Sequence, residues 1–298
     1  MIRLLALDID NTVFNWVDYY VKSLHALFDT LERVTGVARA HLVAEARGVF
    51  TMHNSIEHPF LVQELPSVLA VYGTDYDKLL HEAVDPARDA FNTAANASLV
   101  PYPGVVETLT AIRTARPNLP IVALTDAPRY VAMWKLNKLG LLTYFDAVYG
   151  LPDPTLPTAE GRVLVDMEIL LKHVRKDSFG YKGKIRILPE DYEKPGTKGF
   201  RMVLMDFDIE EQSIARKQIL FVGDNLAKDI HLGKELGILS CWARYGAQIS
   251  PAMRTALQEF SPAANTRKNV ALDPAGSGSP RPDYVIDQFS ELRGIPGI

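Results

Sequence analysis

Residues 4–12, Leu-Leu-Ala-Leu-Asp-Ile-Asp-Asn-Thr, form the stretch that decides the fold. Its apolar half predicts a buried strand that ends where Asp8 begins. Asp8 and Asp10 are two residues apart, so they point to the same side of an extended chain and repel each other unless a cation lies near both. Mg²⁺ is a suitable ion, because it takes a few carboxylates together with phosphate and water oxygens. A polar turn is the alternative, since Asp and Asn are common in turns.

The composition narrows the class of protein. The 298 residues, 47% hydrophobic and 23% charged, are typical of a soluble globular protein with one large or two ordinary domains. A net charge of −4 provides no basic field, so no nucleic-acid partner is expected. The single cysteine, Cys241, lies in an apolar strand-like run and is predicted to be a small buried hydrophobe. No apolar run is long enough to cross a membrane and no signal peptide is visible, so we expect a cytoplasmic location with no membrane partner.

Short apolar runs separated by helical patterns predict an α/β fold with a Rossmann-like, doubly wound parallel sheet. The helical patterns cover Val105–Ala115, Arg129–Leu139 and Ala227–Leu236. The predicted strands are Ile2–Leu7, Ile121–Leu124, Ala147–Tyr149, Ile219–Val222, Leu239–Ala243 and Tyr284–Ile286.

Residues 15–100 interrupt this alternation with apolar positions at helical spacing and no clear strand. We interpret them as a helical cap domain inserted into a core domain formed by residues 1–14 and 101–298. Within the core, residues 151–193 form a small irregular insertion with a possible helix over 163–174. This insertion is expected to be a surface excursion, with a second small lid as the alternative. Residues 261–282 are rich in Gly, Pro and small side chains and predict a loop.

Polar residues follow three of the predicted strands. Asp8 follows the first, Thr125 and Asp126 follow the strand at 121–124, and Asp224 with Asn225 follows the strand at 219–222. In an open parallel sheet, ligands bind outside the carboxyl ends of the strands. We therefore expect these side chains, together with Asp229, to converge on one edge. A single Asp after a strand is explained by turn formation, but several at successive strands indicate a site.

These residues resemble, in order, the four motifs of the haloacid dehalogenase superfamily. The matching positions are Asp8-x-Asp10-x-Thr12, Thr125, Lys194-Pro195 and Gly223-Asp224-x₄-Asp229. The helical insert is similar to the cap of members that resemble phosphoglycolate phosphatase. The lysine is the least specific match, because other lysines lie nearby, namely Lys182, Lys184, Lys198 and Lys217.

The resemblance implies a role for each residue. Asp8 would be the nucleophile that forms an aspartyl-phosphate, and Asp10 would be the general acid and base. Asp10 favours a phosphatase, because dehalogenases and phosphonatases of this family usually lack an acid there. The other implied roles are Mg²⁺ binding by Asp8, Asp10 and Asp224, phosphate binding by Thr125, Asp126 and Lys194, and support from Asp229, Asn225 and Thr12.

The expected function is therefore Mg²⁺-dependent hydrolysis of a small phosphorylated metabolite. The alternatives are a 2-haloacid dehalogenase and a non-catalytic, receiver-like phospho-acceptor module. The oligomeric state, monomer or homodimer, stays open. Trp16 is expected to border the substrate pocket, whereas His53 and His58 are expected to occupy a loop between cap helices. Lys228 is expected on the exposed face of a helix.

Overall fold

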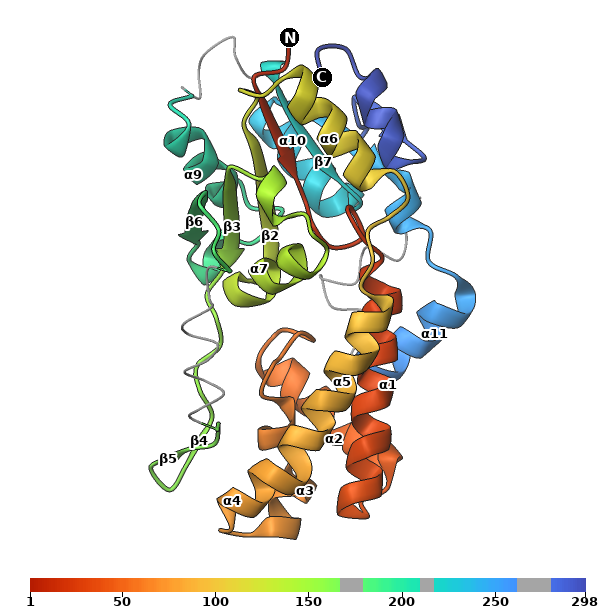
Figure 1. Cartoon of the computed structure of the whole chain (residues 1–298), viewed down its shortest axis with the longest axis vertical. Helices are drawn as coiled ribbons and strands as arrows, with labels where there is room; N and C mark the ends of the chain where they lie inside the picture. The colour runs from red at the N-terminus through yellow and green to blue at the C-terminus, as the bar shows by residue number, and fades with distance from the viewer. Residues whose placement is uncertain (167–178, 210–216, 262–279) are drawn as a thin grey trace.

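The computed structural model describes residues 1–166, 179–209, 217–261 and 280–298 (Figure 1). Its centre is a seven-stranded parallel sheet in the order β6-β3-β2-β1-β7-β8-β9, which confirms the predicted α/β class. All six predicted strands are present, with ends that differ from the expected ones by at most four residues. The strands are β1 (Leu4–Leu7), β2 (Ile121–Pro128), β3 (Ala147–Leu151), β6 (Lys184–Ile187), β7 (Ile219–Gly223), β8 (Leu239–Ala243) and β9 (Tyr284–Ile286).

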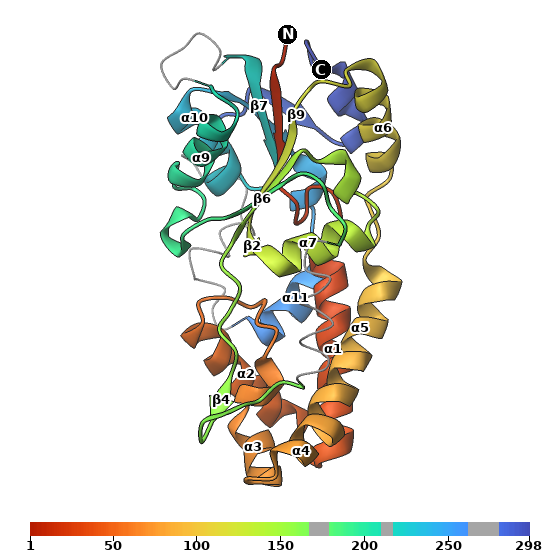
Figure 2. The same cartoon turned by 60° about the vertical axis from the view of Figure 1, so that its left-hand side comes forward.

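Helices bury both faces of the sheet (Figure 2). Leu4 and Ala6 of β1 pack in one cluster with α9 (Lys198–Asp206) and α10 (His231–Leu236). Leu5 and Leu7 face the opposite side, toward α6 (Val105–Ala115) and α7 (Arg129–Lys138). Strands buried on two faces are apolar throughout rather than alternating, which explains why the sequence reveals them. Cys241 is fully buried in β8, as predicted.

Residues 16–98 form helices below the carboxyl end of the sheet (Figure 1). The chain leaves the core at Asn15, whose side chain caps the first helix by accepting from Asp18 N at 2.9 Å. It returns beside its exit, where Tyr102 N donates to Val13 O at 2.9 Å. None of the described helices is both long and apolar enough to cross a membrane. The elements are α1 (Trp16–Thr35), α2 (Arg39–Met52), η1 (Leu61–Glu64), α3 (Pro66–Tyr72), α4 (Tyr76–Leu79), η2 (Leu80–Val84) and α5 (Asp85–Ser98).

Helix α11 (Pro251–Phe260) extends from the core side of the chain and packs against α1 and α2. The Phe260 ring stacks on Phe28, with ring centroids 5.4 Å apart. Arg39 pairs with Glu259 at 2.8 Å, and Arg47 donates to the last carbonyls of α11. The inserted helices are therefore held by α11 as well as by the two linkers.

The irregular insertion predicted at 151–193 is wrong for residues 184–187, which form the edge strand β6. Its sequence, Lys-Ile-Arg-Ile, alternates charged and apolar residues and lacks the continuous apolar run of a central strand. Residues 158–163 form a small hairpin, β4 (Thr158–Ala159) with β5 (Arg162–Val163), beside the inserted helices (Figure 1). The possible helix at 163–174 is wrong for residues 163–166, which are not helical and begin at the end of β5. Residues 167–174 lie outside the described residues, as does most of the loop expected at 261–282.

Candidate active site

Adjacent strands deliver the predicted residues to one edge of the sheet. Leu7 at the end of β1 pairs with Ala123 of β2 and with Val222 of β7. Asp8 and Asp224 therefore emerge directly after β1 and β7. Thr125 lies at the matching level within β2, which continues to Pro128 instead of ending at Leu124 as predicted.

Lys194 is the lysine that contacts the expected nucleophile. Its Nζ lies 2.5 Å from Asp8 Oδ1 and 2.7 Å from Asp229 Oδ1, and its side chain is buried. Burial alone lowers the pKa of Lys194, but the carboxylates of Asp229 and Asp8 raise it well above its usual value. A buried and charged ammonium group next to Asp8 is suited to bind a phosphoryl oxygen.

Three carboxyl groups with raised pKa values share this edge, of which Asp8 and Asp224 are buried and Asp10 is partly exposed. Burial raises the pKa of Asp8 to about 7 against the opposing effect of Lys194, and it raises the pKa of Asp10 to about 6 against the opposing effect of Lys135. The pKa of Asp224 also lies well above its usual value, because of burial and then the charges of Asp229 and Asp8. A nearby cation would favour the ionised form of all three groups.

The oxygen atoms of this edge fit a magnesium ion. Carboxylate oxygens of Asp8, Asp224 and Asp229 lie within 4.8 Å of one another. Mg²⁺ takes hard oxygen ligands and keeps several waters, so two carboxylates and one backbone carbonyl suffice on the protein side. Asp229 is already engaged, because Oδ1 accepts from Lys194 and Oδ2 accepts from Asn225 N at 3.0 Å. Both carboxylate oxygens of Asp229 therefore already have partners within the protein.

Thr12 and Asn225 hold the two loops of the site. Thr12 Oγ1 lies 3.5 Å from Asp8 Oδ2, and the Thr12 carbonyl accepts from Tyr245 OH at 2.6 Å. The Asn225 side chain accepts from Ala227 N at 3.0 Å and from Lys228 N at 3.1 Å, which caps the following turn. Both residues therefore fix backbone near the reacting groups.

Thr125 and Asp126 lie beside Lys194. The buried Thr125 hydroxyl accepts from Ala127 N at 3.1 Å, which leaves its proton available to a ligand. Asp126 accepts from Lys194 N at 3.0 Å and from Lys228 Nζ at 2.6 Å. Although burial opposes it, these two lysines lower the pKa of Asp126. An ionised side chain repels phosphate, so the Asp126 side chain is unsuited to the predicted phosphate contact.

Lys228 differs from the sequence expectation of an exposed helical position. Its side chain is largely buried and points to Asp126 across the site, at 2.6 Å. It therefore fixes the segment that carries Thr125 rather than facing solvent.

Sequence reasoning missed the partners of Asp10. Lys135 of α7 is fully buried, and its Nζ lies 2.8 Å from Asp10 Oδ1 and 2.5 Å from Glu57 Oε1. Glu57 belongs to the segment after α2 and also accepts from Trp16 Nε1 at 2.9 Å. The Lys135 ammonium group thus links Asp10, the expected general acid and base, to the inserted helices. The sequence gives little signal for this, because α7 also carries the exposed Lys138 and no local pattern distinguishes the two lysines.

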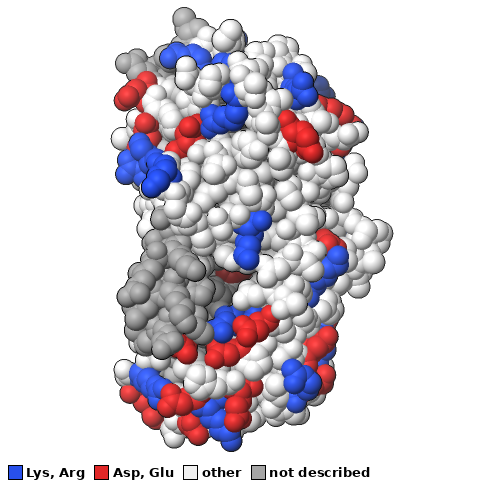
Figure 3. Space-filling model, in the orientation of Figure 1, with Lys and Arg blue, Asp and Glu red and all other residues white. Residues whose placement is uncertain are grey.

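A cavity of about 290 Å³ lies between the sheet edge and the inserted helices. On the face drawn in Figure 3, the surface is hollowed between these two parts, with side chains of both charges along the lower rim. Trp16 lines the cavity, as expected. Seven carboxyl residues but only two lysines, Lys194 and Lys228, are among the described residues of its lining. The acids of the lining are Asp8, Asp10, Glu57, Asp126, Glu193, Asp224 and Asp229.

Comparison with known proteins identifies the family. The model of the haloacid dehalogenase-like hydrolases matches residues 2–237, and a HAD-hydrolase-like model matches residues 192–292. Comparison with curated proteins gives no significant match.

Solved structures share the fold at low sequence identity. A 2-haloacid dehalogenase from Pseudomonas syringae is 18% identical, with a TM-score of 0.55 over 99% of this chain and 97% of that one. The HAD-hydrolase YfnB from Bacillus subtilis, bound to magnesium, is 14% identical, with a TM-score of 0.51 over 100% and 99%. A HAD phosphatase from Thermococcus onnurineus is 19% identical, with a TM-score of 0.50 over 99% and 98%. Because the family model covers most of its length, the chain belongs to the haloacid dehalogenase-like hydrolases.

Proposed function

We propose that this hydrolase is a Mg²⁺-dependent phosphatase that acts through an aspartyl-phosphate on Asp8. The observation that carries the proposal is the separate pairing of two neighbouring acids. Asp8 pairs with Lys194, and Asp10 pairs with Lys135. Two carboxyl groups in different surroundings are suited to different tasks, one as nucleophile and the other as acid and base.

In the proposed reaction each step is assigned to one residue of the site. The Asp8 carboxylate attacks phosphorus in line, and Asp10 donates its proton to the leaving alcohol oxygen. Asp10 then accepts a proton from the water that hydrolyses the intermediate, which returns Asp8 to its carboxylate. Lys194 and the Thr125 hydroxyl stabilise the charge on the phosphoryl oxygens.

The charge of the cavity supports a cation requirement. A phosphate dianion that enters a lining with seven acids and two lysines meets net repulsion. Mg²⁺, held by the carboxylates of Asp8 and Asp224 and the backbone carbonyl of Asp10, would supply neutralisation of the phosphoryl charge. The YfnB structure with magnesium concerns a protein of the same fold.

The other half of the cavity supports a neutral leaving group. The residues that line this half are apolar or uncharged apart from the acids named above, and no lysine or arginine is among the described residues of this half. Among the described residues of the lining, a second phosphate or carboxylate on the substrate would find no cationic partner, whereas hydroxyl and hydrocarbon groups would find polar and apolar ones. The substrate class is therefore a small monoester of an uncharged alcohol. The residues concerned are Trp16, Val17, Phe50, Thr51, Asn54, Ser55, Ile56, Ile249, Leu257 and Ser261.

The test is turnover of p-nitrophenyl phosphate with Mg²⁺, followed by a panel of phosphorylated metabolites. We expect many turnovers per chain, with monoesters of neutral alcohols preferred over esters that carry a second anion. One phosphate retained per chain would instead support a receiver-like module. Chloride release from a 2-haloacid without phosphatase turnover would support a dehalogenase.

A further inference from the structure

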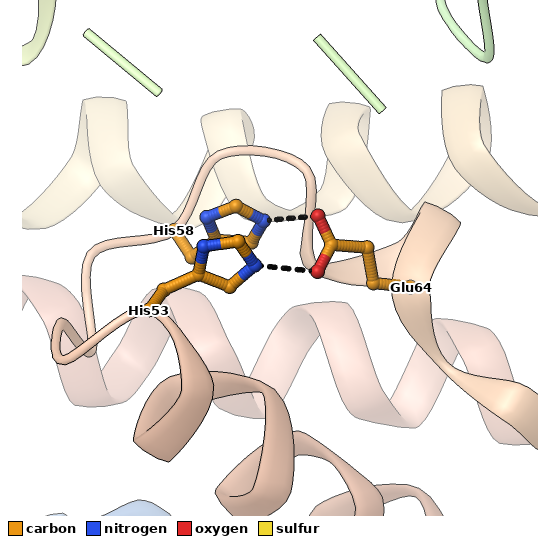
Figure 4. A group of neighbouring side chains, drawn as sticks. All are labelled: His53, His58 and Glu64. Carbon is orange, nitrogen blue, oxygen red and sulfur yellow. Dashed lines mark hydrogen bonds and ion pairs between the residues drawn. The ribbon is translucent and has the colours of Figure 1, made fainter. Parts of the chain in front are cut away.

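Two histidines and one glutamate, none of which is among the residues that line the active-site cavity, form a compact cluster (Figure 4). The rings of His53 and His58 stack with centroids 3.8 Å apart and planes 13° apart. His53 Nε2 lies 2.6 Å from one Glu64 carboxylate oxygen, and His58 Nε2 lies 2.9 Å from the other. One ring nitrogen of each histidine and one carboxylate oxygen of Glu64 lie within 4.8 Å of one another.

The surroundings of His58 favour its neutral form. The His58 side chain is 1% exposed, and burial lowers its pKa despite the opposing effect of Glu64. A neutral imidazole has one nitrogen free to bind a metal when the other carries the proton. The His53 side chain is 30% exposed, so water has access to one side of the cluster.

We propose that His53, His58 and Glu64 form a binding site for a transition-metal ion of the Zn²⁺ class. Two imidazoles and one carboxylate are a three-ligand set that zinc accepts, with water in the fourth position. Nitrogen ligands separate this site from the all-oxygen edge that suits Mg²⁺.

The required rearrangement is small. Tetrahedral zinc with bonds of about 2.0–2.1 Å holds its ligand atoms about 3.3 Å apart. The present N–O separations of 2.6 and 2.9 Å must therefore widen by less than about 1 Å. The two rings must also tilt toward a common point, and each Nε2 must pass its hydrogen to Nδ1 or to solvent.

The position of the site gives it a structural consequence. His53 directly follows α2, and Glu64 ends η1, so the ion would join the two ends of the connecting segment. Asn54, Ser55, Ile56 and Glu57, within that segment, line the active-site cavity. A bound ion would therefore fix the part of the inserted helices that faces the substrate.

The experiment measures metal binding by the full-length chain after removal of metals with EDTA and dialysis. Zn²⁺ titration by calorimetry and the absorption spectrum of added Co²⁺ are recorded with Mg²⁺ in excess and in an Asp8→Asn background, which removes a ligand of the oxygen site. We expect one Zn²⁺ per chain and a tetrahedral Co²⁺ spectrum. His53→Ala and Glu64→Gln should each weaken Zn²⁺ binding at least ten-fold.

His41→Ala is the matched control, because His41 also lies beside a glutamate, Glu45, at 3.2 Å, and is exposed. It should bind Zn²⁺ as the parent chain does. Circular dichroism of the His53 and Glu64 variants establishes that they are folded. Failure of the parent chain to bind Zn²⁺, or equal binding by His53→Ala, would overturn the proposal.

Discussion

Replacement of Lys135 by Met tests whether one buried ammonium group holds Asp10 and Glu57 together. At an effective dielectric constant of about 20, unit charges 2.8 Å apart attract by about 6 kcal/mol, before the cost of removing them from water. Removal of one partner of a buried ion pair costs about 3–5 kcal/mol of stability, because the remaining charge is left uncompensated. Here two carboxylates lose their partner at once, so we expect a loss at the upper end of that range.

The assay is urea unfolding followed by circular dichroism, with Lys138→Met as the control. Lys138 lies on the same helix but is exposed, so the same chemical change should alter the free energy of unfolding by less than about 0.5 kcal/mol. A loss below about 1 kcal/mol for Lys135→Met would refute the reasoning, because the pair would then contribute no more than a surface contact.

The pH dependence of the stability loss in Lys135→Met provides a second test. Burial already raises the pKa of Asp10 to about 6, above its unfolded value, and loss of Lys135 raises it further. A raised carboxyl pKa means that the folded chain binds the extra proton, so the variant regains stability as the pH falls from 8 through 6 toward 4. The difference between Lys135→Met and the parent chain should therefore shrink at low pH, and a constant difference would contradict the assignment.

Four further predictions concern the reaction. Asp8→Asn should abolish phosphatase turnover while the unfolding curve stays cooperative; residual activity above about 1% in a steady-state assay would remove Asp8 as nucleophile. Asp10→Asn should slow both formation and hydrolysis of the intermediate by about 10²–10⁴-fold in rapid-quench experiments, and an unchanged kcat would exclude acid–base action. EDTA should eliminate turnover and Mg²⁺ should restore it, so activity that persists in excess chelator would contradict the cation requirement. Trp16→Ala should raise KM, because it lines the cavity and holds Glu57; unchanged kinetics over a substrate panel would argue against this.

The central sheet was predictable because its strands are buried on both faces. Leu4–Leu7 and Ile219–Gly223 are apolar from end to end, and polar residues follow each of them directly. The edge strand at 184–187 escaped prediction, since one of its faces is exposed and its residues alternate. The hydrophobic pattern of the sequence therefore predicts which strands are buried better than it predicts which strands pair.

The residues of the candidate site likewise fall into those that the sequence pattern predicts and those that only tertiary packing brings together. Asp8, Asp224 and Thr125 follow recognisable strands, so the rule that strand ends converge was enough to bring them together. Lys135 and Glu57 meet across 78 residues of sequence, and only the packing of α7 against the inserted segment creates their contact. His53 and His58 do lie in a loop, as expected, but their stacking and their shared carboxylate depend on a fold that no local pattern encodes.

Mass spectrometry of the acid-quenched enzyme during turnover tests the central claim most directly. The phosphorylated chain is digested under acidic conditions, and the modified peptide is sequenced by mass spectrometry. The account predicts one phosphoryl group on Asp8, formed only with Mg²⁺ and absent from Asp8→Asn. A phosphoryl group on another residue would contradict this prediction. Full turnover by the parent chain would also contradict it if no phosphorylated chain were found at any quench time, either in the parent chain or in the Asp10→Asn variant.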